Sequence, residues 1–102
     1  MTDRKKLPDH IKIKKKHDNL CKLVFDILDT QGLNPQLSVE YEKKDRIIGE
    51  MDVFCRGVYY ECKCNYNKKQ YKKGKEQIYR AEENNQCHTG YVVTYEGLYH
   101  IF

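Results

Sequence analysis

Two adjacent apolar segments that contain several charged residues constrain the fold of this chain more than any other feature. Segments 47–55 and 58–64 are rich in β-branched and aromatic residues, and Arg56-Gly57 between them is typical of a hairpin turn. Alternate residues of a strand share a face. One face of the first strand should therefore carry Ile48, Glu50, Asp52 and Phe54, and the other Gly49, Met51, Val53 and Cys55.

In the second segment the same alternation places Glu61 and Lys63 on the face of Tyr59. Charges in such apolar strands are costly unless they are paired or bind a metal. Carboxylates on neighbouring strands, here Asp52 and Glu61, offer the oxygen ligands that Mg²⁺ prefers. Lys63 would point to the same place and orient a metal-bound water or balance phosphate charge. The alternative is a solvated hairpin face with weak cross-strand ion pairs.

The spacing of these residues resembles the signature of the PD-(D/E)xK, or restriction-endonuclease-like, nucleases. Asp52 is followed, after eight residues, by Glu61-Cys62-Lys63. The local context 49–53, Gly-Glu-Met-Asp-Val, is similar to that of archaeal Holliday-junction resolvases and related small nucleases.

This resemblance implies a nuclease that depends on Mg²⁺ or Mn²⁺ and hydrolyses DNA phosphodiester bonds. Asp52, Glu61 and the backbone carbonyl of Cys62 would bind the metal, and Lys63 would act on the water. Glu50 would be a further acidic ligand or support the others.

Helical periodicity predicts helices at 17–31 and from 68 to about 84. The first has its apolar stripe at Leu20, Leu23, Val24, Ile27 and Leu28 and would be capped by Asp18 or Asn19. In the resembled family a glutamate on this helix often joins the metal site. The acids here are Asp18, Asp26 and Asp29, so the sequence does not identify a third acidic ligand.

Further strands are expected at 37–41, 90–95 and 98–102, which gives the order α-β-β-β-α-β-β. The chain is therefore expected to be an α/β protein. The resemblance extends over nearly all of the chain after residue 16. It implies a restriction-endonuclease-like core, in which two helices flank a mixed central sheet.

A length of 102 residues fits one domain. Residues 1–16 are rich in lysine and are expected to form a basic, partly disordered arm before a single nuclease-like domain at 17–102. The net charge of +4 and the nine tyrosines favour a nucleic-acid partner. No segment is apolar enough to span a membrane, and five cysteines without a secretory signal indicate an intracellular, cytoplasmic protein with reduced thiols.

The start of the second predicted helix carries the densest basic patch of the chain. Its expected nucleic-acid contacts are Lys68, Lys69, Lys72, Lys73 and Lys75, with Tyr66 and Tyr71 as stacking surfaces. Gln77 and Arg80 lie one turn apart on this helix and could face the end of the sheet that carries the acids. Related nucleases often place a glutamine or lysine there, so Gln77 joins the candidate catalytic residues.

The cysteines offer a competing site. Cys62, Cys64, Cys87 and His88 contain the donors of a zinc centre. Their spacing does not fit a zinc knuckle, so buried packing is the preferred interpretation. His17, His88 and His100 have no identifiable partner in the sequence.

The leading hypothesis is thus a metal-dependent nuclease, with branched or structured DNA as its substrate. A homodimer is expected, because junction resolution needs two active sites. A compact nuclease of this composition would suit an archaeal genome or a viral one, in which case it would act in the host cytoplasm. The alternatives are a non-catalytic nucleic-acid-binding module with the same fold and a small protein-interaction module.

Overall fold

The computed structural model describes residues 9–65 and 67–102, with side chains described from residue 14 onward. Two helices and five strands follow one another in the predicted order α-β-β-β-α-β-β. Their bounds are α1 Asp9–Thr30, β1 Gln36–Lys43, β2 Arg46–Cys55, β3 Val58–Cys62, α2 Lys68–Glu83, β4 Thr89–Thr94 and β5 Gly97–His100.

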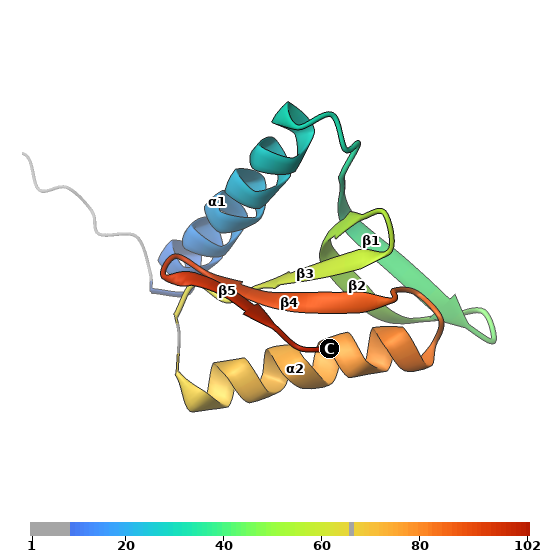
Figure 1. Ribbon diagram of the computed structural model, residues 1–102. Coiled ribbons are helices and arrows are strands. Elements are labelled where there is room, and N and C mark those ends of the chain that lie inside the picture. Colours follow the sequence, from blue (N-terminus) through green and yellow to red (C-terminus); the bar gives the residue numbers. More distant parts are fainter. Residues whose placement is uncertain (1–8, 66) are drawn as a thin grey trace, which may run out of the picture.

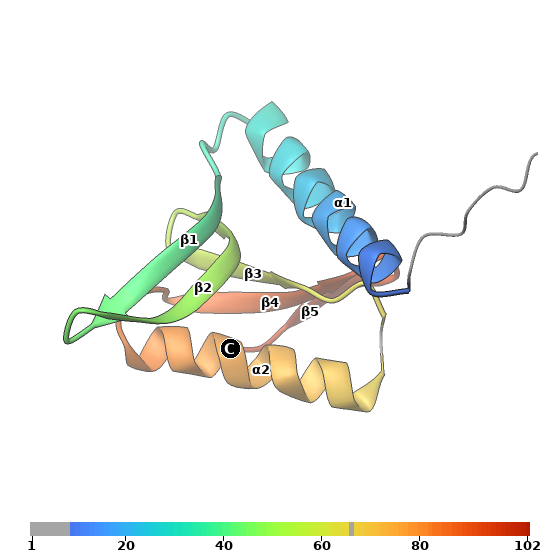
Figure 2. The same ribbon diagram turned by 180° about the vertical axis from the view of Figure 1, so that it is seen from behind.

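The five strands form one mixed sheet in the order β1-β2-β3-β4-β5. Neighbouring strands are antiparallel except β3 and β4, which are parallel and are connected by α2. Helix α1 packs on one face of the sheet and α2 on the other (Figures 1 and 2). The described chain is therefore a mixed α/β protein, as expected.

Each helix closes a separate apolar cluster against its own face of the sheet. On the α1 side the buried residues are Leu20, Cys21, Val24, Leu28, Val53, Cys55, Cys62 and Val93. On the α2 side they are Tyr41, Met51, Tyr59, Ile78, Ala81, Cys87 and Val92. The strands of the sheet that lie between the two clusters are therefore packed against apolar side chains on both faces.

Helix α1 begins eight residues earlier than the sequence predicted, at Asp9 instead of residue 17. Asp18 and Asn19 consequently lie inside the helix and do not cap it. Lysine is a good helix former, so the basic segment can continue the helix although it lacks an apolar stripe. The Tyr95 hydroxyl donates to the carbonyl of Lys16 at 3.0 Å, which joins this part of α1 to the β4–β5 turn. The remainder of the expected arm, residues 1–8, lies outside the described residues.

The predicted alternation along β2 is wrong at Asp52. Met51 packs in the α2-side cluster, whereas Val53 packs in the α1-side cluster, although both were expected on one face. The β1–β2 register passes from Leu37↔Val53 to Val39↔Met51 and skips Ser38, whose φ is +53°. A non-glycine residue in the left-handed region interrupts a regular strand. The sheet is therefore irregular beside Asp52.

Candidate functional site

Strands β2 and β3 separate from each other at the two acids. Their register ends at Val53↔Tyr60, and its continuation would place Asp52 opposite Glu61. In the gap, the backbone N–H of Cys62 donates to Oδ2 of Asp52 at 2.9 Å. The Asp52 carboxylate thus replaces the missing backbone partner and holds the end of β2 beside β3.

Glu61 lies in the interior, on the α2 side of β3, with a relative exposure of 3%. The hydroxyl of Tyr59 donates to its Oε2. The Lys63 ammonium lies 3.8 Å from Oε1, and both side chains contact α2 where Gly74 allows a close approach. A methyl group at Gly74 would lie 3.5 Å from Cγ of Glu61 and 3.4 Å from Cε of Lys63. Tyr59, Glu61 and Lys63 therefore share one face.

The two neighbouring carboxyl groups have pKa values that are shifted in opposite directions. Burial raises the pKa of Glu61 well above its usual range, and the nearby charge of Asp52 raises it further. Burial would also raise the pKa of Asp52, but hydrogen bonds from His17, Glu61 and the Cys62 backbone hold it below its usual value. These shifts favour the proton on Glu61 and the charge on Asp52.

His17 and Cys21 approach the same carboxylate from α1. Nε2 of His17 lies 3.2 Å from Oδ2 of Asp52, and Sγ of Cys21 lies 3.8 Å from Nε2. Hydrogen bonds to Asp52 and Cys21 raise the pKa of His17 to about 11, so the imidazole is a cation at neutral pH. A hydrogen bond from the Cys62 thiol, helped by His17, lowers the pKa of Cys21 to about 6.

Sequence reasoning missed both of these residues. The sequence identified no partner for His17, so an ordinary surface or core histidine was expected, and the structure places it against Asp52. The signal was the i, i+4 spacing of His17 and Cys21 on the stripe that contains Leu20 and Val24. Because the helix was predicted to start at residue 17, His17 was its first residue, and the helical pattern did not place it against the sheet.

Gln77 and Glu50 lie at opposite sides of the carboxyl pair. Gln77, on α2, lines a hollow together with Lys63 and Arg80, and its buried Oε1 has no hydrogen-bond partner among the described residues. Glu50, on β2, is exposed and lines a hollow with Asp52 and His17. Its backbone carbonyl accepts a hydrogen bond from Tyr59 at 3.3 Å.

The predicted basic patch forms the outer surface of the first half of α2. Its five lysines are exposed: Lys68, Lys69, Lys72, Lys73 and Lys75. Tyr71 packs edge-on against Tyr99, with ring centroids 6.1 Å apart, so part of its ring is used within the fold. Tyr66, the other expected stacking residue, lies outside the described residues.

The cysteine set considered as a zinc centre does not come together. Cys62 belongs to the α1-side cluster and Cys87 to the α2-side cluster, so the sheet separates them. His88 is exposed and lies against the hairpin turn at Gly57. Buried packing, the preferred interpretation, is correct for Cys62 and Cys87.

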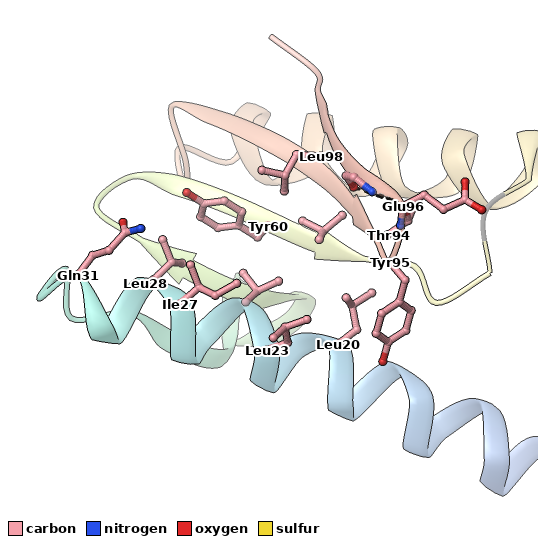
Figure 3. A pocket seen from close by; sticks show the side chains of 13 residues that line it. Leu20, Leu23, Ile27, Leu28, Gln31, Tyr60, Thr94, Tyr95, Glu96 and Leu98 are labelled. Carbon is pink, nitrogen blue, oxygen red and sulfur yellow. Dashed lines mark hydrogen bonds between the residues drawn. The ribbon is translucent and has the colours of Figure 1, made fainter.

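An apolar groove of about 400 Å³ lies between α1 and the β4–β5 turn (Figure 3). Leu23 and Ile27 of α1 face Leu98 across it, and all three side chains are about half exposed. The lining contains none of the carboxyl, imidazole or thiol groups described above. The groove is therefore chemically distinct from the carboxyl pair.

Comparisons with protein-family models, curated proteins and solved structures found no match to this chain. Among the described residues, no helix is both long and apolar enough to cross a membrane.

Proposed function

We propose that this protein is a divalent-metal-dependent nuclease that hydrolyses DNA phosphodiester bonds. The observation that carries the proposal is the placement of the Asp52 and Glu61 carboxyl groups at adjacent positions where β2 and β3 separate, with the Lys63 ammonium 3.8 Å from Glu61. An acid pair beside a lysine is the constellation that the resemblance to PD-(D/E)xK nucleases implies. The parallel β3–β4 pair connected by α2 agrees with the restriction-endonuclease-like core expected from that resemblance.

The donor set at the carboxyl pair fits Mg²⁺ or Mn²⁺. Two neighbouring carboxyl groups repel each other once both are ionised, and this repulsion contributes to the raised pKa of Glu61. A divalent cation would relieve the repulsion, and carboxylate oxygens are its preferred ligands. The Lys63 N–H donates to Val93 of β4, so the Cys62 N–H and carbonyl leave β3 on the other side, toward Asp52. That carbonyl is thus available as a third ligand.

The chain's own groups have distinct roles in hydrolysis. When bound, the metal would lower the pKa of a water molecule and neutralise charge on the phosphate. Lys63 would orient that water and balance the charge of the phosphate. Gln77 lines the same hollow as Lys63, and its side chain would hydrogen-bond to the water. Glu50 lies near enough to support Asp52 from the solvent side.

The exposed lysines of α2 supply the phosphate contacts on the substrate. They lie at the start of the helix, where positive charge opposes the helix dipole and an external anion would be stabilising. No described segment stands apart from the core to read bases in a major groove, which favours branched or structured DNA over a defined sequence. A homodimer would provide the two sites that junction cleavage needs.

A cleavage assay on labelled linear, single-stranded and four-way-junction DNA tests the proposal. With Mg²⁺ or Mn²⁺ the wild type should cut at least one substrate, and EDTA should stop it. Glu61→Gln should reduce the rate about a hundredfold or more, since the metal contributes several kcal/mol to transition-state stabilisation. Glu83→Gln, an exposed site at the end of α2 that is away from this hollow, is the matched control and should cut normally.

The same experiment separates the two alternatives. A chain that binds DNA in a salt-dependent manner but never cuts it would be a binding module. A chain that does neither would be an interaction module.

A further inference from the structure

A second cluster, beside the carboxyl pair, combines nitrogen, sulfur and oxygen donors from α1 and β2. A ring nitrogen of His17, Sγ of Cys21 and a carboxylate oxygen of Asp52 all lie within 4.8 Å of one another. We propose that these three residues bind a transition-metal ion of the zinc type. This site shares Asp52 with the proposed Mg²⁺ or Mn²⁺ site but differs from it in its other two ligands, and it does not depend on nuclease activity.

The separations of the donor atoms suit a tetrahedral ion. Bonds from zinc to nitrogen, oxygen and sulfur are about 2.0–2.3 Å, so the ligand atoms of a tetrahedron lie about 3.3–3.6 Å apart. Nε2 of His17 is 3.2 Å from Oδ2 of Asp52 and 3.8 Å from Sγ of Cys21. Small adjustments of the side chains would therefore replace the two hydrogen bonds by metal–ligand bonds.

The kinds of donor atoms select against the hard cations. Thiolate and imidazole suit zinc and cobalt, whereas magnesium prefers oxygen alone. Three protein ligands leave a fourth tetrahedral position for water, as in open zinc sites. A hollow of about 220 Å³, lined in part by Lys22 and Ser38, leads to the cluster from solvent.

The cluster is held in place by its surroundings. His17 and Cys21 lie one turn apart on α1, and Leu20 between them is buried at 1% relative exposure. Asp52 is fixed by the Cys62 N–H at 2.9 Å, and Cys21 and Cys62 are buried in the same α1-side cluster. Such supporting hydrogen bonds orient the ligands of metal sites.

Cobalt(II) titration of the full chain, in the presence of a reductant that does not bind metals, tests the site. The wild type should develop a thiolate-to-cobalt absorption band that saturates at one ion per chain and disappears when zinc is added. Cys21→Ser should lose this band, and His17→Gln should weaken binding. Cys87→Ser is the matched control, because Cys87 lies in the α2-side cluster across the sheet from Cys21, and it should keep the band.

A wild type without the band, or a Cys21→Ser variant with an undiminished one, would overturn the proposal. Circular dichroism checks that each variant folds. If Cys21→Ser does not fold, unchanged cobalt binding by His17→Gln overturns the site instead. Cobalt absorption is independent of DNA, so a failure of the cleavage assay would count against the nuclease and leave this result in place.

Discussion

The two carboxyl groups at the centre of the site are neighbours, yet they belong to different faces of the sheet. Asp52 is oriented toward α1, where it is ionised and paired with the His17 cation. Glu61 is oriented toward α2, where burial and the charge of Asp52 favour its protonated form. The carboxylate on the α1 side thus forms a stabilising ion pair. The carboxyl group on the α2 side is disfavoured in its charged form.

This difference teaches why both acids can exist in so small a core. A buried pair of like charges would be strongly unfavourable, and the fold avoids it by neutralising one acid with a proton and the other with a cation. A bound metal ion could replace either the proton on Glu61 or the His17 cation beside Asp52. Substitutions that remove one charge at a time therefore distinguish a structural acid from one kept for binding.

The largest expected effect on stability is the contrast between Asp52→Asn and Glu61→Gln in EDTA at pH 7. Asp52→Asn leaves the His17 cation without its partner and should lower the free energy of unfolding by about 1–3 kcal/mol. Glu61→Gln should be neutral or stabilising, since the amide can still donate to Asp52 and accept from Tyr59. Urea unfolding measures both.

Asp18→Asn is the control for this comparison. Asp18 lies 3.6 Å from Nδ1 of His17, but its side chain is 62% exposed, so the change should stay within about 0.5 kcal/mol. Equal losses in Asp52→Asn and Glu61→Gln would contradict the comparison and make Glu61 a structural ion-pair partner.

The part of this comparison that the sequence predicts is the α2 half. Strand alternation correctly placed Tyr59, Glu61 and Lys63 on one face, because β3 keeps a regular parallel register with β4 from Val58 to Cys62. Helical spacing predicted α2, and the hairpin turn predicted the antiparallel β2–β3 pair. Local periodicity is enough where a strand stays regularly paired with one neighbour along its length.

The α1 half could not be predicted by the same means. Its geometry depends on the left-handed Ser38, which breaks the alternation next to Asp52, and serine gives no sequence signal for that conformation. It also depends on the early start of α1, which a lysine-rich segment without an apolar stripe conceals. The contact of His17 with Asp52 spans 35 residues, so it arises from tertiary packing.

A smaller effect should appear in the pH dependence of stability in EDTA. His17 has a pKa of about 11 in the fold and 6.5 when unfolded, so its contribution is complete below pH 6.5 and is lost as the pH rises toward 11. Cys21 has a pKa of about 6 in the fold and 9.0 when unfolded, so its contribution grows between pH 6 and 9. The two trends oppose each other between pH 6.5 and 9.

Cys21→Ser removes one of these opposing trends. The free energy of unfolding of the variant should fall more steeply from pH 6.5 to 9 than that of the wild type, as measured by urea titrations at several pH values. Cys87→Ser is the matched control, because burial raises the pKa of Cys87 to about 11 and its thiol stays protonated in this range. Parallel profiles for wild type and Cys21→Ser would show that the thiol is not coupled to His17.

The smallest effect is expected at the surface of the α2 half. Lys68 and Lys72 lie one turn apart on the exposed side of α2, and we expect each to contact a phosphate. The double change to alanine should weaken DNA binding several-fold. It should also reduce the slope of log K against log salt by about 1.8 on duplex DNA, because each contact contributes about 0.9.

The double change of Lys43 and Lys44 to alanine, at the β1–β2 turn, is the control. It removes the same charge from another exposed position and should leave the slope almost unchanged. If the slope of log K against log salt were equal in the two double variants, DNA binding would depend only on the net charge of the protein. The α2 surface would then have no specific part in binding.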